Sequence, residues 1–428
     1  MAAFDGRILE VGPKARSAAG RNAEIIRLSG ETWPGLIDSH IHLEGLADRK
    51  LTLDLSGTRD LRETVARVKE WSAKLPKDGW VSGAGWYNDA WPDSGFPTRR
   101  QLDTAAGGRP AYLRRKDGHS AWVSTAALRL AGIDRGRENP PGGTIDRDEA
   151  GEPTGILRET AMRLVSDIIP RPEAKDLDAA MARVLGELAR VGLTGVHSMD
   201  SARGFSALQR LQARGKLPIR VTYNLPLADL AYAERIGLRS GWGDGWLRFW
   251  GVKAFLDGSL GSRTAEMLDG SGTARLPQPE LVDMIQRCAR AELNVCLHAI
   301  GDGALRRALD ALTPPRNSWI GWRPRLEHAQ CVDPKDMPRM AKLGVIASMQ
   351  PVHAVADREL ADSLWPSVVG HSYAWRALER AGVRLAFGSD APVETADPLA
   401  GIDAATAWRK RVGWHPELAL SRPSALRA

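Results

Sequence analysis

The chain has 428 residues, of which 43% are hydrophobic and 26% are charged. This balance is typical of a soluble globular protein and excludes a disordered chain. No apolar run is long enough to span a bilayer, and the first residues lack the basic and apolar regions of a secretory signal. Three cysteines in so long a chain form no disulfide framework, so we expect a cytoplasmic protein.

The formal net charge is +7 and the pI is about 9.4, and a basic pI is one indication of nucleic-acid binding. The basic residues nevertheless occur in scattered groups, such as Arg99-Arg100 and Arg409-Lys410-Arg411. Neither zinc-finger spacing nor an RNP-like aromatic strand nor a basic helix accompanies them. We therefore interpret the charge as a solvated surface. The expected partner is a small-molecule substrate rather than a nucleic acid or a membrane.

Residues 1–34 precede the main pattern and predict two short strands, around Arg7–Val11 and Glu24–Leu28. From residue 35 onward, short apolar runs alternate with helical patterns, which favours a parallel sheet in an α/β fold. Ten of these runs are candidate strands: Gly35–His40, Trp80–Gly85, Ala111–Arg114, Thr194–Met199, Pro218–Asn224, Trp250–Leu256, Asn294–Ala299, Arg325–Gln330, Val345–Gln350 and Arg384–Asp390. A (β/α)8 barrel needs eight strands, and periodicity alone does not tell which two are surplus.

The clearest helical pattern covers Glu173–Gly192, where apolar residues from Leu177 to Val191 fall on one face and Gly192 is a suitable stop. Residues 86–160 break the alternation. They are rich in Pro, Gly and Trp, which suits a long insertion over one face of a barrel. We therefore predict a distorted (β/α)8 TIM barrel over residues 35–428, with an insertion at about 86–160.

Six polar residues share one feature, because each lies in or just after an apolar run. They are His40, His42, Lys253, His298, His328 and Asp390. In an extended strand, residues two apart point the same way, so His40 and His42 can chelate one ion. A lone His-x-His pair is usually incidental, but strand ends converge at one mouth of a barrel. The shared placement therefore favours an N/O-rich site for zinc or a similar divalent metal.

Lys253 is the unusual member of this set, because an ammonium group cannot ligate a cation. Burying the charged group without a partner would cost several kcal/mol. It must therefore be neutral, paired or chemically modified. A salt bridge with Asp257 or Glu327 is the structural alternative. Burial can lower the pKa of a lysine enough to allow the neutral or the chemically modified state.

Seven segments spread over nearly the whole chain carry a family resemblance. They are Pro34-Gly35-Leu36-Ile37-Asp38-Ser39-His40-Ile41-His42, Asp117-Gly118-His119-Ser120-Ala121-Trp122, Pro153-Thr154-Gly155, Lys253-Ala254-Phe255-Leu256-Asp257-Gly258-Ser259-Leu260-Gly261-Ser262-Arg263, His298-Ala299-Ile300-Gly301-Asp302, Glu327-His328-Ala329-Gln330 and Gly388-Ser389-Asp390-Ala391-Pro392. In combination they resemble the amidohydrolase superfamily, and within it the YtcJ-like branch that includes N-substituted formamide deformylase.

The resemblance implies roles for five of these residues in holding one or two divalent ions, zinc being the expected metal. His40 and His42 match the ligands of a first metal, and His298 and His328 match those of a second. Lys253 matches a lysine that reacts with carbon dioxide. The resulting carbamate is an anionic ligand that bridges the two metals.

Asp390 matches the aspartate that binds the first metal and takes a proton from the hydrolytic water. One or two divalent ions lower the pKa of bound water from about 15.7 towards ~7 and polarise a carbonyl. A carboxylate beside that water serves as general base and then protonates the departing nitrogen. No Gly-x-Ser-x-Gly elbow indicates a serine nucleophile. We therefore predict a metal-dependent hydrolase with Asp390 as the catalytic residue. Its expected substrate is a non-peptide C–N bond in an amide, formamide or cyclic amide.

Three further residues are candidates for substrate binding. His119 and Trp86 belong to the predicted insertion, with Trp91 close by, and His353 follows a candidate strand. His197 also ends a candidate strand, and we interpret it as a core residue.

The resemblance also predicts a small β-sandwich built from both chain ends. Residues 1–34 would supply only part of it, and the chain stops at Ala428 before the returning strands. We therefore expect an incomplete sandwich whose apolar face is partly uncovered unless a homodimer covers it. Two alternatives stay open. One is ester or phosphoester hydrolysis at the same metals, and the other is a truncated, inactive remnant that acts as a binding protein.

Overall fold

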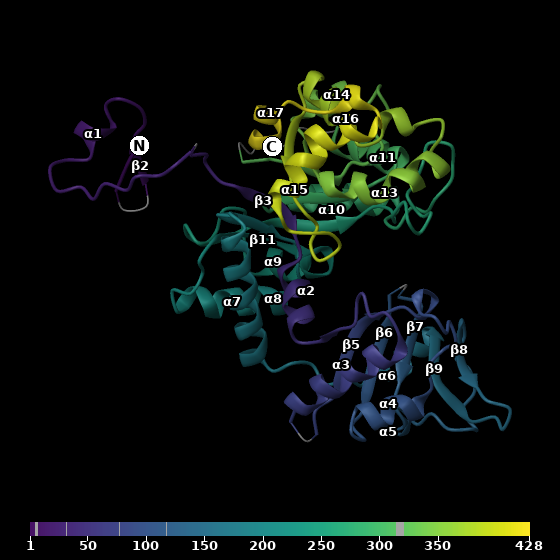
Figure 1. Ribbon diagram of the computed structural model, residues 1–428. Coiled ribbons are helices and arrows are strands. Elements are labelled where there is room, and N and C mark those ends of the chain that lie inside the picture. The colour runs from purple at the N-terminus through teal and green to yellow at the C-terminus, as the bar shows by residue number, and fades with distance from the viewer. Residues whose placement is uncertain (5–6, 31, 77, 117, 314–320) are drawn as a thin grey trace. The chain divides into compact units, whose positions relative to one another are not determined.

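The computed structural model describes residues 1–4, 7–30, 32–76, 78–116, 118–313 and 321–428 (Figure 1). Contacts within the chain define two compact units, Met1–Leu36 and Ile37–Ala428, and each is described by itself. Asp117, which belongs to one of the motifs above, lies outside the described residues. In the described part of the chain, no helix is both long and apolar enough to cross a membrane.

The first unit has one antiparallel pair of strands followed by a helical turn. Its elements are β1 (Ala2–Phe4), β2 (Arg7–Glu10) and α1 (Ala15–Ala18). Strand β2 confirms the strand expected around residues 7–11. The strand expected over residues 24–28 is wrong, because these residues adopt no regular structure. Ile25 and Ile26 are 67% and 72% exposed, since no strand in the described part of this unit lies beside them to pair with them.

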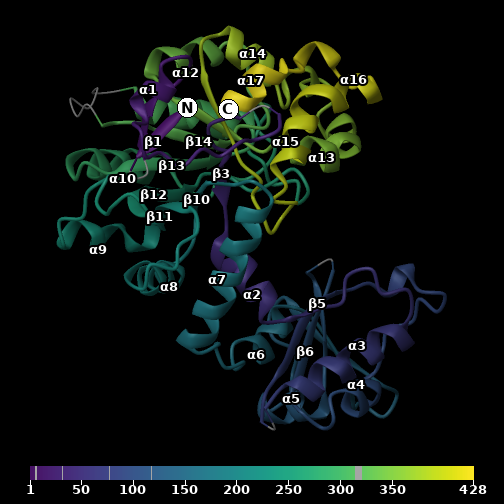
Figure 2. The ribbon, with the colours of Figure 1, turned by 60° about the vertical axis from the view of Figure 1, so that its left-hand side comes forward.

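The second unit contains a nearly closed parallel barrel of eight strands, which confirms the predicted fold class (Figures 1 and 2). The strands are, in sheet order, β3 (Ile37–Ile41), β10 (Gly195–Ser198), β11 (Arg220–Pro226), β12 (Leu247–Phe255), β13 (Asn294–Ala299), β14 (Arg325–His328), β15 (Ile346–Met349) and β16 (Arg384–Phe387). Past the end of β16, the Asp390 N–H donates to the His40 carbonyl at 2.7 Å, so the last strand returns to the first.

The apolar runs form these strands because a parallel sheet is covered on both faces. Val252, Val295 and Leu326 are fully buried. The helices of the barrel part are α2 (Leu43–Lys50), α7 (Ala174–Arg190), α8 (Ala202–Ala213), α9 (Leu230–Arg235), α10 (Gln278–Arg290), α11 (Asp302–Leu312), α12 (Met337–Leu343), α13 (Pro351–Leu364), α14 (Trp375–Arg380), α15 (Pro398–Asp403), α16 (Arg409–Val412) and α17 (Arg422–Arg427).

Helix α7 confirms the helix predicted over Glu173–Gly192. Its apolar face from Leu177 to Leu188 is buried. Val191, which we placed on that face, lies beyond the helix and is 43% exposed. The chain leaves the helix through Gly192 with φ of +93°, a left-handed conformation that glycine adopts without strain.

A second sheet of six strands accounts for the two surplus strands. Its order is β4 (Leu53–Asp54), β5 (Val81–Trp86), β6 (Ala111–Arg115), β7 (Ser120–Val123), β9 (Pro153–Glu159) and β8 (Gly143–Arg147). The runs at 80–85 and 111–114 are β5 and β6 of this sheet. The helices in this part are α3 (Leu61–Lys74), α4 (Arg99–Ala105), α5 (Thr125–Leu130) and α6 (Arg163–Ser166) (Figure 2). The region predicted as an insertion at 86–160 thus belongs to a sheet that already begins at Leu53 and has its own hydrophobic core.

Candidate metal centre

The carboxyl ends of the barrel strands bring all six predicted residues into one cluster. His40 lies in β3, Lys253 in β12, His298 in β13 and His328 at the end of β14. His42 directly follows β3, and Asp390 follows β16. The parallel strands end at the same mouth of the barrel, which is why residues 350 positions apart in the sequence meet here. The side chains are buried except for that of His42, which is 28% exposed.

Asp390 lies at the centre of the first group of ligand atoms. Its Oδ1 is 3.5 Å from Nε2 of His40 and 3.1 Å from Nε2 of His42. The Lys253 Nζ lies 3.5 Å from the same His40 Nε2. His40, His328 and Asp390 each offer one ligand atom, and these three atoms lie within 4.8 Å of one another. A single divalent ion could therefore be held by this group.

The second group consists of His298 and His328, whose ring centroids are 4.4 Å apart, and His328 lies within reach of both groups. Nε2 of His298 lies 2.8 Å from the Gly258 carbonyl and donates to it, so Nδ1 of this ring carries a lone pair. Nδ1 of His298 and Nδ1 of His328 are both buried without a hydrogen-bond partner in the described residues. A buried polar atom without a partner costs free energy. A divalent metal is the kind of group that would satisfy both nitrogens, and the residues present fit one.

Burial gives the cluster the protonation states that ligands need. It lowers the pKa of His40 to about 4 and that of His298 to about 3, so both imidazoles are neutral at pH 7. Burial likewise lowers the pKa of the Lys253 ammonium group. His42 differs. Burial opposes its charge, but ion pairs with Asp200 and Asp390 raise its pKa to about 9, so it must release a proton when a metal binds.

Backbone geometry also aims the ligands. His328 has φ of 72° and Asp390 has φ of 57°, which are left-handed conformations that non-glycine residues rarely adopt. Such strain persists only where surrounding contacts hold it. Gly388 leaves room for β3, because a Cβ at this position would lie 2.4 Å from the His40 backbone nitrogen. A side chain at Gly388 would therefore push apart the two strands that supply His40 and Asp390.

The candidate substrate-binding residues have three different locations. His353, in α13, joins the cluster. Its Nε2 is 3.6 Å from Oδ2 of Asp390, and its ring stacks on His328 at 6.0 Å. His119, directly before β7 of the six-stranded sheet, is 69% exposed and pairs with Glu159, so its role stays a prediction.

Trp86 requires a correction, because its side chain is fully buried in the core of the six-stranded sheet. It packs against Trp91 and Trp122, and its Nε1 donates to the Leu113 carbonyl at 2.8 Å. A side chain with no exposed surface and a satisfied donor has nothing to offer a substrate. Trp91 belongs to the same core and is 5% exposed. Both tryptophans therefore have a packing role.

Two carboxylates beside the ligands are absent from the sequence-based set. Asp200, the second residue after β10, places Oδ1 3.7 Å from Nδ1 of His42. Glu327, in β14, accepts a hydrogen bond from Nδ1 of His40 at 2.7 Å. The sequence offered one signal for each of them: Asp200 is a polar residue shortly after an apolar strand, and Glu327 is a polar residue inside one. Glu327 was considered only as a partner of Lys253. The other proposed partner, Asp257, instead accepts hydrogen bonds from backbone N–H groups, including that of Gly301.

A model of the amidohydrolase family matches residues 28–428. The chain belongs to the amidohydrolase family. It is 33% identical to the putative amidohydrolase YtcJ of Bacillus subtilis over 399 residues, covering 89% of this chain and 74% of that protein. It is 29% identical to the N-substituted formamide deformylase of Arthrobacter pascens, covering 99% and 83%. These matches confirm the resemblance given by the seven motifs.

A solved structure supports the same assignment. The crystal structure of an uncharacterized metal-dependent hydrolase from Pyrococcus furiosus is 31% identical and superimposes with a TM-score of 0.77, covering 92% of this chain and 80% of that one. Together with the family and the His–Asp cluster, this similarity identifies a metal-dependent hydrolase on a TIM barrel and implies a divalent metal.

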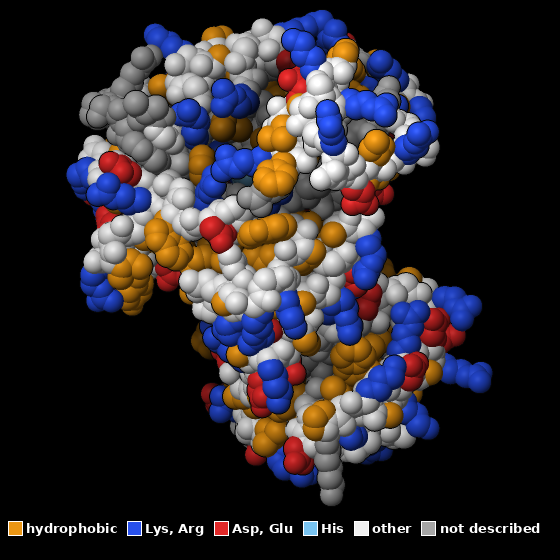
Figure 3. All heavy atoms as spheres, turned by 90° about the vertical axis from the view of Figure 1, so that its left-hand side faces the viewer, with side chains coloured by type: hydrophobic (Ala, Val, Ile, Leu, Met, Phe, Trp, Pro, Cys, Tyr) orange, Lys and Arg blue, Asp and Glu red, His pale blue; other side chains and the backbone are white. Residues whose placement is uncertain are grey.

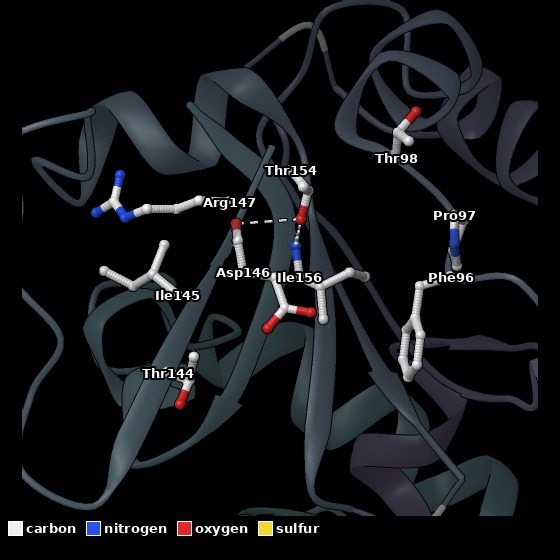
Figure 4. A pocket seen from close by; sticks show the side chains of 9 residues that line it. All are labelled: Phe96, Pro97, Thr98, Thr144, Ile145, Asp146, Arg147, Thr154 and Ile156. Atoms are coloured by element: carbon white, nitrogen blue, oxygen red, sulfur yellow. Dashed lines mark hydrogen bonds between the residues drawn. The ribbon is translucent and has the colours of Figure 1, made fainter. Parts of the chain in front are cut away.

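A separate hollow lies on the six-stranded sheet (Figure 4). Its volume is about 410 Å³, and it is lined by Phe96, Pro97, Thr98, Thr144, Ile145, Asp146, Arg147, Thr154 and Ile156. The Asp146 carboxylate is already held by Arg158, and its backbone carbonyl accepts from the Thr154 hydroxyl at 3.2 Å. The lining contains no imidazole or thiol, so the His–Asp cluster in the barrel is the candidate for catalysis.

Proposed function

We propose that this chain hydrolyses a non-peptide C–N bond in an amide, formamide or cyclic amide. The observation that carries the proposal is the cluster at the barrel mouth, where imidazole nitrogens without partners lie beside a buried aspartate. The similarity to an N-substituted formamide deformylase supports this class of bond.

The proposed ligands divide into two groups. His40, His42 and Asp390 would hold a first divalent ion, and His298 and His328 would hold a second. Zinc is the proposed metal, because it favours imidazole nitrogen and carboxylate oxygen. The 3.1 Å contact between His42 Nε2 and Asp390 Oδ1 supports the first group, and the unpartnered Nδ1 atoms of His298 and His328 support the second.

Lys253 would complete the site as a carbamate. Burial lowers the pKa of its ammonium group, which favours the neutral amine. The lone pair of that amine attacks the carbon of carbon dioxide and forms an N–C bond. One C=O π bond of carbon dioxide breaks, and its oxygen takes the negative charge of the new carbamate. A proton from the nitrogen leaves to solvent. The product is an anion beside His40, whose Nε2 is 3.5 Å from the lysine nitrogen.

A bound divalent ion supplies an acidified water and polarises the substrate carbonyl. Asp390 is placed to take the proton from the attacking water and then deliver it to the departing nitrogen. Hydrogen bonding to His42 favours the carboxylate form of Asp390 although burial opposes it, so its pKa lies below the ordinary range. His353, 3.6 Å from Asp390, is placed to orient the substrate.

Asp390→Asn tests this proposal. The variant keeps the size of the side chain but not its basicity, so kcat should fall by about 10²–10⁴. The assay is a panel with an N-substituted formamide, a cyclic amide, a carboxylic ester and a phosphate ester, each run with metal content measured. Asp397→Asn is the matched control, because this exposed aspartate caps α15 and asparagine also caps helices. Full turnover of Asp390→Asn with metal bound would contradict the mechanism. Preference for an ester would change the substrate class.

The proposed partner is a small molecule, and the proposed location is the cytoplasm. On the face shown in Figure 3, Lys and Arg side chains are scattered among apolar and acidic ones instead of gathering in one stripe. This face therefore presents no basic stripe of the kind that follows a phosphate backbone. Cys288, Cys296 and Cys331 are buried and free, which supports a reducing compartment.

A further inference from the structure

An ion pair is buried inside the barrel, beside the candidate metal ligands. Arg325 and Glu327 both lie in β14 and are 3% and 0% exposed. The Arg325 Nε donates to Oε1 of Glu327 at 2.8 Å, and Nη2 donates to Oε2 at 3.0 Å. The guanidinium also donates to the Ser39 carbonyl at 2.5 Å and to the Ser348 hydroxyl at 2.8 Å. Arg325 is thereby fixed to two neighbouring strands, β3 through Ser39 and β15 through Ser348, and it fixes the Glu327 carboxylate in turn.

The free side of that carboxylate meets a ligand imidazole. Oε2 of Glu327 lies 2.7 Å from Nδ1 of His40. A carboxylate that receives donors on both oxygens can only accept, so the hydrogen of this contact must belong to His40 Nδ1. A neutral imidazole carries one ring hydrogen, and its other nitrogen then has a lone pair. That nitrogen, Nε2, faces Asp390 and Lys253 at 3.5 Å each.

We infer that Glu327, held by Arg325, locks His40 in the Nδ1–H tautomer and thereby presents Nε2 to the metal. Glu327 and Arg325 are positioning residues, since neither is among the proposed ligands and Glu327 acts through His40. The metal-binding role of this arrangement rests on the proposed function. The tautomer itself rests only on the three hydrogen bonds that the Glu327 carboxylate accepts, two from Arg325 and one from His40. Hydrogen-bonding partners of this kind typically change metal affinity by about 10- to 100-fold when they are replaced.

Glu327→Gln tests the role directly. A glutamine amide has one acceptor oxygen and one NH2 group that only donates, so it cannot accept from both Arg325 and His40 through two oxygens. The readout is the metal dissociation constant, measured by competition of Zn²⁺ with a chromophoric chelator. We expect binding to weaken by about 10- to 100-fold.

The control is a carboxylate–guanidinium pair of the same kind away from the cluster. Asp178, in α7, is 5% exposed and receives Nε of Arg210 at 3.0 Å and Nη2 at 2.7 Å. Asp178→Asn breaks this pair and should leave zinc affinity within about twofold, since no ligand depends on it. A folded Glu327→Gln protein with wild-type affinity would overturn the inference. Equal weakening in Asp178→Asn would do the same, because it would mean that general destabilisation explains the loss.

A measurement on the unaltered chain decides the matter if Glu327→Gln does not fold. Long-range ¹⁵N–¹H correlation spectra of histidine-labelled, metal-free protein distinguish the two neutral tautomers, and a His40→Gln sample identifies the signal. The Nδ1–H pattern is expected for His40, and the Nε2–H pattern would overturn the inference. Failure of the wild-type chain to bind zinc would instead refute the proposed function, and the tautomer would still be measured.

Discussion

Replacing Gly388 by alanine tests how closely β16 must approach β3 at the site. The added Cβ would lie 2.4 Å from the His40 nitrogen, 2.8 Å from Oδ1 of Asp38 and 2.9 Å from Cβ of His40. Ordinary contacts begin at 3.4 Å, so the strands must separate by about 1 Å. Overpacking of this kind costs about 1–3 kcal/mol. The displacement also moves Asp390, two residues further along, and metal sites tolerate only about 0.2 Å in ligand distances.

We therefore expect Gly388→Ala to lower the urea midpoint of the metal-free chain and to weaken zinc binding at least tenfold. Gly186→Ala is the control, because a Cβ at Gly186, in helix α7, would meet nothing within 4 Å. That change should be neutral or stabilise the fold by about 0.5–1 kcal/mol. Wild-type stability together with wild-type zinc affinity in Gly388→Ala would refute the steric argument.

Two further predictions concern acid sensitivity and the tryptophan core. Burial and the nearby Arg325 lower the pKa of His197 to about 3, against 6.5 for an unfolded histidine. Between these two pKa values the unfolded chain binds more protons than the folded chain. The free energy of unfolding therefore falls as the pH drops through 6.5. Between pH 7.5 and 5.5 the wild-type chain should lose about 1 kcal/mol more than His197→Asn, as measured by urea unfolding, and identical losses would contradict the shift. Trp86→Phe should lower the midpoint of thermal unfolding because it leaves space in a packed core, while KM for any substrate found stays unchanged. A raised KM at wild-type stability would restore Trp86 as a substrate contact.

Much of the barrel could be predicted from the sequence because its signals are local. A buried parallel strand is a short apolar run, and a ligand at its carboxyl end is a polar residue where that run stops, as at His298 and Asp390. Once the strands are taken as parallel, the convergence of these residues follows from barrel geometry rather than from any further motif. His353 was predicted from the same signal, since it comes shortly after a candidate strand, and its side chain lies in the cluster.

The remaining features depend on partners far away in the sequence. Strands β5 and β6 have the same local pattern as barrel strands, and only pairing decides which sheet a strand joins. Trp86 stood in a segment rich in Pro and Gly, where composition does not distinguish a pocket wall from a second core. Glu327 is 287 residues from His40, and nothing in the sequence reports that contact. The side chains that orient the ligands are therefore visible only in the folded chain.

The most direct measurement is elemental analysis of the purified chain beside Lys253→Ala, with Lys116→Ala as a control for loss of an exposed lysine. The proposed site predicts close to two zinc-like ions per wild-type chain, a clear loss in Lys253→Ala and no change in the control. One ion that is unaffected by Lys253→Ala would contradict the bridged site and leave Lys253 a structural residue. A wild-type chain that holds no metal after supplementation with zinc would contradict the account as a whole.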